Sequence, residues 1–202
     1  MSTAELTASD TSEWKMPSTR KAGMICLIIT ESALFSIFVV AYIFYKGKSL
    51  TPPYAPDLLT WAKFPWFGSI ALIGSSFTIM GAEYFLRRNR KFGFQIWWGI
   101  TILMGSYFLY FTATEWYELI YHEGLTLQSN VFGTTFYSLV GLHASHVIIG
   151  LILLSLVWFL NLFNKVPADH HEHLEMVSWY WHFVDVVWLV VLLVVYIWSP
   201  HF

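Results

Sequence analysis

Charged residues and cysteine are scarce in this chain of 202 residues, and both shortages restrict what it can be. Only 12% of the residues are charged, whereas soluble domains carry roughly 25%. The single cysteine, Cys26, excludes a disulfide or a thiolate cluster within one chain. Apolar residues make up 56% of the sequence, and a formal net charge of −2 gives no sign of a polyanionic partner. The composition indicates a membrane protein.

Apolar runs in the sequence are long enough to cross about 30 Å of hydrocarbon as helices. Proline-rich or polar segments separate them, so each run should be a helix of its own. We therefore expect an all-α, polytopic bundle, with a polar segment at residues 1–21 and one transmembrane domain of five helices at residues 22–202. The predicted spans are Ala22–Tyr45, Trp66–Leu86, Gly93–Thr114, Phe132–Phe163 and Leu174–Trp198.

The distribution of lysine and arginine predicts the orientation of this bundle. Cytoplasmic loops are enriched in these residues. With the N-terminus inside and the C-terminus outside, the outer segments carry only Lys46, Lys48 and Lys63. The inner segments then carry Lys15, Arg20, Lys21, Arg87, Arg88, Arg90, Lys91 and Lys165. The N-inside, C-outside orientation is favoured, with residues 1–21 in the cytoplasm.

Several ionisable residues fall inside the apolar runs, where an uncompensated charge is costly. Glu31 lies roughly 13 Å along the first span, and its own helix offers only Tyr42 as a polar neighbour. We expect its carboxyl group to be neutral or hydrogen-bonded to another helix. Two interpretations stay open for Glu31: a site that exchanges protons or contacts lipid, and a structural carboxyl group.

Other polar residues are expected to form a network between the helices. Glu175, His182 and Asp185 lie within an arc of about 80° on the last span. His143 and His146 lie one turn apart on the fourth span, and Glu115 and Glu118 end the third span near the outer interface. Hydrogen bonds between helices are the simplest account of these residues. The predicted network comprises Glu115, Glu118, His143, His146, Glu175, His182 and Asp185.

A metal centre is the competing interpretation of the same residues. Carboxylate-bridged di-iron sites pair Glu and His three residues apart on one helix, and that motif is absent here. A copper–thiolate site would need cysteine ligands that the chain does not have.

The loop histidines His170, His171 and His173 are either solvated or collect protons from bulk water. We predict no catalytic residue, no metal site and no cofactor in this chain, with a stand-alone membrane metalloenzyme as the alternative. A proton-coupled transporter is disfavoured because no inverted repeat is visible.

Several motifs, in their order and spacing, resemble subunit III of haem-copper respiratory oxidases, in particular of cytochrome c oxidase. The matching segments are Thr30-Glu-Ser-Ala-Leu-Phe35, Glu115-Trp-Tyr-Glu118, Phe132-Gly-Thr-Thr-Phe-Tyr137, Gly141-Leu-His-Ala-Ser-His-Val-Ile-Ile-Gly150, His171 with Glu175, and Trp179-Tyr-Trp-His-Phe-Val-Asp-Val-Val-Trp188. Together they cover nearly everything from Met24 onward. The mitochondrial form has two further helices at its start, and the lipid cleft that those helices help to form is in doubt here.

The resemblance implies an accessory subunit of an aerobic respiratory oxidase in a bacterial plasma membrane. Such a subunit packs against catalytic subunit I, with subunit II and others nearby, binds structural phospholipid and supports proton uptake, while haem and copper reside in the partners. It implies that Glu31 is the family's buried carboxyl group, involved in lipid contact or proton uptake, and that His170, His171 and His173 collect protons. A quinol oxidase subunit III is the nearest alternative, and a nitric oxide reductase subunit a more remote one.

Overall fold

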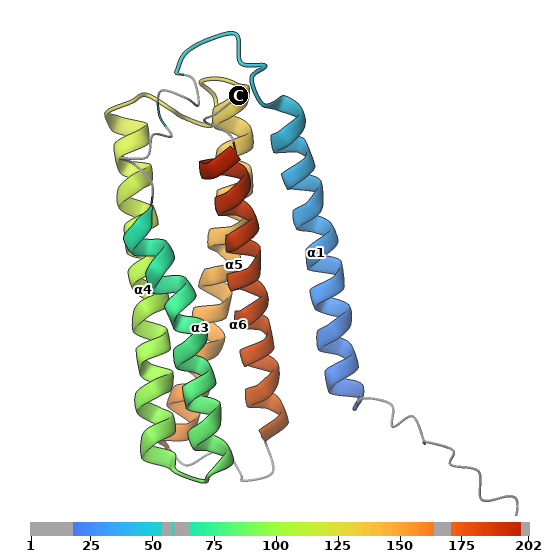
Figure 1. The fold of residues 1–202 in the computed structure, drawn as a ribbon, viewed down its shortest axis with the longest axis vertical. Coiled ribbons are helices and arrows are strands. Elements are labelled where there is room, and N and C mark those ends of the chain that lie inside the picture. Colours follow the sequence, from blue (N-terminus) through green and yellow to red (C-terminus); the bar gives the residue numbers. More distant parts are fainter. Residues whose placement is uncertain (1–17, 54–57, 59–64, 164–170, 199–202) are drawn as a thin grey trace, which may run out of the picture.

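The computed structural model describes residues 18–53, 58, 65–163 and 171–198 (Figure 1). This part of the chain is helical and contains no strand, which confirms the all-α prediction. The helices are α1 (Thr19–Tyr45), α3 (Trp66–Arg87), α4 (Lys91–Tyr121), α5 (Val131–Leu162) and α6 (His171–Leu192), and α6 continues as the π-helix η3 (Leu193–Trp198).

Five helices in the described residues are long and apolar enough to cross a membrane. Their lengths run from 22 to 32 residues, and the most apolar 18-residue window of each has a mean hydropathy between 1.3 and 2.3. The chain is therefore a multi-pass membrane protein, as predicted. The predicted bounds are close, but α4 continues to Tyr121 because no glycine or proline interrupts it before Gly124. Glu115 and Glu118 are consequently helical residues.

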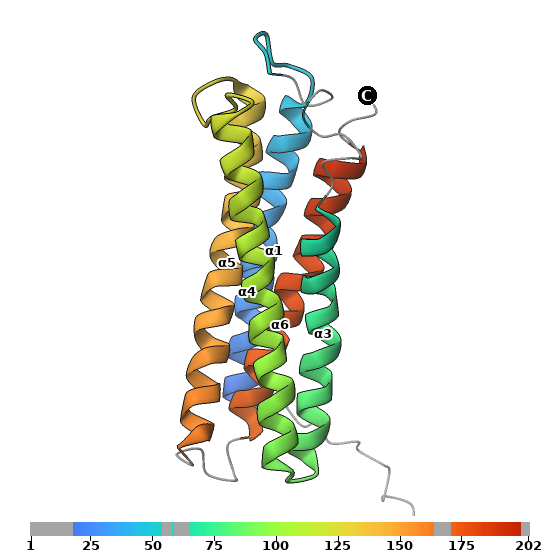
Figure 2. The ribbon, with the colours of Figure 1, turned by 90° about the vertical axis from the view of Figure 1, so that its left-hand side faces the viewer.

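The helices run side by side along the long axis of the molecule (Figures 1 and 2). α3 and α4 form an antiparallel pair, joined by a short turn in which Asn89 has a φ of 53°. Asparagine tolerates this left-handed conformation better than most residues. α5 packs on α4 and α6, while α1 lies at the edge of the bundle against α5 and α6. Only Phe35 and Tyr42 of α1 are fully buried.

One end of the bundle is rich in positive charge, and we call it the basic end. α1, α4 and α6 begin there, and α3 and α5 end there. The charged residues that define it are Arg20, Lys21, Arg87, Arg88, Arg90 and Lys91. Glu115 and Lys46 lie toward the opposite end.

Close packing surrounds the ring of Trp181 on α6, which is fully buried. A Cβ atom on Gly105 of α4 would lie 2.6 Å from Trp181 Cη2, and one on Gly150 of α5 would lie 2.9 Å from Trp181 Cε3. Real Cβ atoms do not approach so closely, so both glycines are needed where the indole wedges between α4 and α5. This wedge fixes the depth and rotation of α6, which carries His182 and Asp185.

Candidate functional site

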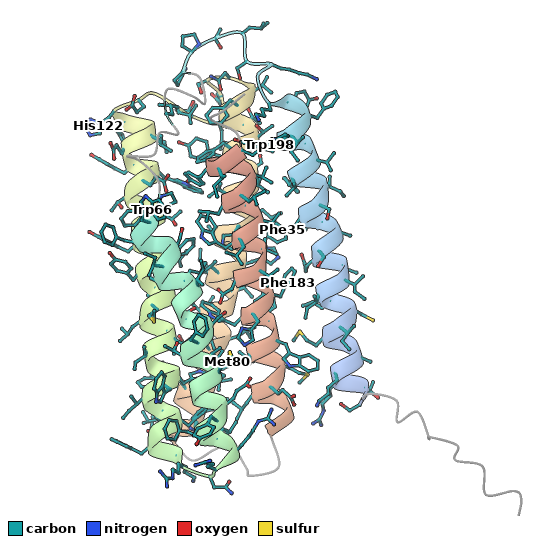
Figure 3. The ribbon with its side chains drawn as sticks, viewed as in Figure 1. Phe35, Trp66, Met80, His122, Phe183 and Trp198 are labelled. Atoms are coloured by element: carbon teal, nitrogen blue, oxygen red, sulfur yellow. The ribbon has the colours of Figure 1, made fainter. Side chains whose placement is uncertain are left out.

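A polar pair in the middle of the bundle joins α1 to α5. Glu31 Oε2 lies 3.1 Å from His146 Nε2, and the two side chains are 28% and 10% exposed. The ring of Phe35 covers the pair, with its centroid 4.9 Å from that of His146 and 6.3 Å from that of Phe183. Figure 3 shows Phe35 and Phe183 in the space between α1 and α6. The carboxyl group of Glu31 therefore has its partner on another helix.

The proton content of this pair follows from the second ring nitrogen of His146. His146 Nδ1 lies 2.8 Å from the carbonyl oxygen of Leu142, one turn earlier on α5. A carbonyl only accepts hydrogen bonds, so Nδ1 carries a proton and donates it. One further proton is then shared between His146 Nε2 and Glu31. Whichever atom holds it, the pair has no net charge, which suits an apolar environment.

A second polar chain connects α3 and α6 through a serine. Ser76 donates its hydroxyl proton to Asp185 Oδ2, and His182 Nδ1 lies 3.1 Å from the same Ser76 Oγ. Because that hydroxyl already donates to Asp185, the natural assignment makes His182 Nδ1–H the donor to Ser76. We call His182, Ser76 and Asp185 the α3–α6 chain. It runs from a half-buried imidazole to a buried carboxyl group whose Oδ1 has no partner among the described residues.

His143 is buried in an aromatic environment rather than in either polar chain. Its ring stacks on Trp188 with 5.0 Å between centroids, and Phe108 meets its edge at 5.8 Å. Neither ring nitrogen has a hydrogen-bond partner within the described residues. His143 and His146 are one turn apart on α5 but have different neighbours.

Two indole groups of α6 also bind serines of α3. Trp181 Nε1 donates to Ser75 Oγ at 2.8 Å, and Trp188 Nε1 donates to Ser69 Oγ at 3.1 Å. These contacts lie in the same interface as the bond between Ser76 and Asp185. Sequence reasoning missed all of these serines. The available signal was the occurrence of Ser69, Ser75 and Ser76 on an apolar span, where hydroxyl groups often bond to a neighbouring helix.

The remaining acids of the predicted network lie nearer the two ends of the bundle. Glu115 Oε1 accepts a hydrogen bond from Tyr196 of η3 at 2.7 Å, while Glu118 is exposed.

Beyond the end of α1, Lys46 Nζ donates to the carbonyl oxygen of Trp198 at 3.0 Å and lies 3.8 Å from the centroid of the Trp198 ring. Partial desolvation lowers the pKa of Lys46 from its usual value of 10.5. At the basic end, Glu175 Oε2 lies 3.0 Å from Lys21 Nζ.

The three loop histidines of the sequence analysis are outside what the structure describes. His170 lies outside the described residues, as do the side chains of His171 and His173. Among the residues that are described, no three His, Cys, Asp or Glu side chains lie close enough together to hold a metal ion. The structure thus brings together Glu31 with His146, His182 with Asp185 through Ser76, and Glu115 with Tyr196. It keeps His143 and Glu118 apart from these groups.

Comparison with known proteins identifies the family. The profile described as cytochrome c oxidase subunit III matches residues 4–200. Cytochrome c oxidase subunit 3 of Synechocystis sp. is 36% identical over 184 residues, which is 90% of this chain and 76% of the relative. The rabbit protein of that name (Oryctolagus cuniculus) is 35% identical over 185 residues, or 88% and 69% of the two chains. That of Thermostichus vulcanus is 32% identical over 183 residues, or 90% and 88%. With this coverage, the chain belongs to the cytochrome c oxidase subunit III family.

Proposed function

We propose that this chain is an accessory subunit of a haem-copper terminal oxidase in a bacterial plasma membrane. It packs against catalytic subunit I, near subunit II, and haem and copper reside in those partners. Its basic end faces the cytoplasm, as the positive-inside rule predicts. The chain stabilises the catalytic subunit, holds phospholipid and supports proton uptake. The observation that carries this proposal is that ionisable side chains inside the spans have polar partners on other spans.

The use of these side chains supports an accessory role over a catalytic one. His146 and His182 are two candidate metal ligands inside the spans, and each has one ring nitrogen in a contact with a side chain on another helix. The other ring nitrogen of His146 bonds to a backbone carbonyl group of its own helix. His143 is enclosed by Phe108 and Trp188. A haem with two axial histidines would need imidazoles on facing helices at matched depths, with their nitrogens directed at a common iron atom. These contacts favour helix association instead.

The same contacts are suited to exchanging protons. A carboxyl group that shares a proton with an imidazole, as Glu31 does with His146, can release or accept it with little change in geometry. In the α3–α6 chain, the hydroxyl of Ser76 both accepts and donates, which is the arrangement that passes a proton along hydrogen bonds. We assign these groups to the support of proton uptake by the oxidase.

Purification of the complex in mild detergent tests the proposal. The tagged chain should bring with it a protein that shows the optical spectrum of a haem-copper oxidase. Removal of the chain from that complex should leave the spectrum intact but shorten the period over which the oxidase works during continuous turnover. Loss of the haem spectrum on removal would contradict an accessory role.

Metal analysis of the isolated chain separates this proposal from the stand-alone metalloenzyme. Stoichiometric iron or zinc in the purified chain, or oxygen consumption by it, would favour the enzyme.

The electron donor of the oxidase is a separate question, because other subunits bind the donor. A copper-binding cysteine pair in the companion subunit II would indicate cytochrome c, and its absence would indicate quinol.

A further inference from the structure

A cavity of about 480 Å³ lies at the basic end, where α1, α3 and α6 come together. Its walls combine opposite charges: one cation comes from α1, a cation and an anion come from α3, and an anion comes from α6. The formal charge of the lining is therefore zero, because two positive and two negative side chains balance. The lining residues are Lys21, Glu83, Leu86, Arg87 and Glu175.

The two sides of this cavity differ in how their charges are paired. On one side, Lys21 Nζ and Glu175 Oε2 are 3.0 Å apart and neutralise each other. On the other, Glu83 and Arg87 belong to the same helix four residues apart, so their Cβ atoms are about 6 Å from each other. Neither makes an ion pair or a side-chain hydrogen bond with another described residue. The cavity thus presents one available anion and one available cation, a helical turn apart.

This arrangement discriminates between classes of ligand. A simple anion attracted by Arg87 would also meet Glu83 and Glu175, and a simple cation attracted by Glu83 would meet Arg87 and Lys21. A zwitterion whose phosphate and ammonium groups are a few bonds apart satisfies both charges together. The phosphoethanolamine headgroup has this form, and its ammonium group carries protons to donate to a carboxylate.

An apolar stripe on α6 and η3 begins beyond His182, which lies on the same face of α6 between the cavity and the stripe. Successive residues of an α-helix are 100° apart around its axis, so Val186 is displaced from Glu175 by 20° and Leu193 by 0°. Both residues therefore lie on the face that carries Glu175. Both are more than half exposed, at 59% and 57%. α6 lies between α1 and α3 (Figure 1). An acyl chain whose headgroup lies in the cavity can therefore follow this stripe toward the opposite end.

We propose that this cavity binds the headgroup of a zwitterionic phospholipid of the phosphatidylethanolamine class. Its phosphate binds Arg87, its ammonium group binds Glu83, and an acyl chain lies along Val186 and Leu193. The proposal deepens the proposed binding of phospholipid, and rests on it, by naming a site and a headgroup. Leu86 closes the apolar side of the headgroup cavity.

Native mass spectrometry of the full chain, released from nanodiscs that contain equal amounts of phosphatidylethanolamine and phosphatidylglycerol, tests this assignment. The chain should retain phosphatidylethanolamine preferentially. Glu83→Gln removes the partner of the ammonium group and the repulsion of an anionic headgroup. The retained ratio of the ethanolamine lipid to the glycerol lipid should then fall by roughly threefold, as expected for the loss of one interfacial ion pair.

Matched variants keep this test decisive. Glu83→Asp preserves the charge and should preserve the preference, while Arg87→Gln should lower retention of both lipids. Arg90→Gln makes the same change of charge at the same end, outside the cavity, and should alter nothing. Equal retention of the two lipids by the wild type overturns the proposal. So does an unchanged ratio in Glu83→Gln with intact helical circular dichroism. Failure of the accessory role would appear separately, as the absence of a co-purifying haem protein.

Discussion

Glu31 on α1 and His146 on α5 are 115 residues apart in sequence, and their side chains meet with 3.1 Å between Oε2 and Nε2. This contact is one side-chain ion pair that joins α1 to a neighbouring helix, and that of Lys21 with Glu175 of α6 is another. Apolar contacts hold α1 less firmly, since only Phe35 and Tyr42 of this helix are fully buried. The position of α1 at the edge of the bundle thus depends in part on a proton-sharing pair.

Replacement of Glu31 should weaken the docking of α1. Glu31→Ala leaves His146 Nε2 without its partner, and we expect a loss of about 1 kcal/mol, in line with hydrogen bonds between membrane helices. Glu31→Gln retains a hydrogen bond to the imidazole and should cost less. Reversible unfolding in detergent measures both. Ser32→Ala, which alters an exposed hydroxyl bonded within α1, is the control and should be near neutral.

Enlargement of the glycines around Trp181 should destabilise the bundle by overpacking. Gly105→Ala places a Cβ atom 2.6 Å from Trp181 Cη2, so the indole or α4 must move, and about 1–3 kcal/mol of stability should be lost. Thermal unfolding in detergent measures the effect. Gly23→Ala on α1 is the matched control, because nothing lies within 4 Å of the added atom. Equal stability of the two variants would show that the wedge is less tight than described.

Removal of the serine that accepts the Trp181 hydrogen bond should cost more than removal of an exposed serine. Ser75→Ala leaves the buried indole N–H without an acceptor, and such an unpaired donor costs about 1–3 kcal/mol. Ser36→Ala removes only an exposed hydroxyl bonded to the Ser32 carbonyl and should change little. The comparison of their unfolding free energies isolates the contact between helices. A result in which both variants match the wild type would contradict this assignment.

Interruption of the α3–α6 chain should affect the oxidase complex without affecting its cofactors. Ser76→Ala breaks the link between His182 and Asp185, and Asp185→Asn keeps an acceptor for Ser76 but cannot exchange a proton. If the chain supports proton uptake, both variants should shorten the working life of the oxidase during turnover, most clearly at alkaline pH, where protons are scarce. The haem spectrum should be unchanged. Normal working life in both variants would remove this chain from the proton-support proposal.

Cysteine accessibility checks the orientation of the bundle. Cys26 is the only cysteine of the sequence, so Cys26→Ser provides a background without thiols. On that background, Arg90→Cys at the basic end should react with a membrane-impermeant maleimide only from the cytoplasmic side. Gln128→Cys, in the exposed loop at the opposite end, should react only from the outside. The reverse pattern would place the N-terminus outside.

The sequence alone determined the number, the approximate positions and the helical nature of the spans. Inside a membrane each backbone N–H and C=O must be paired, and an apolar run of sufficient length can meet that requirement only as a helix. It also showed which ionisable residues would lie inside the spans, because their positions within these runs can be counted. Glu31, His143, His146, His182 and Asp185 were all found in this way.

The partners of those residues were decided by the tertiary structure. Glu175, His182 and Asp185 share one face of α6, yet Glu175 bonds to Lys21 of α1, whereas His182 and Asp185 bond to Ser76 of α3. The choice depends on the depth and rotation of neighbouring helices. These are set by close packing at a few positions, such as Trp181 between Gly105 and Gly150. Periodicity fixes the face on which a side chain lies; only the packed bundle fixes what faces it.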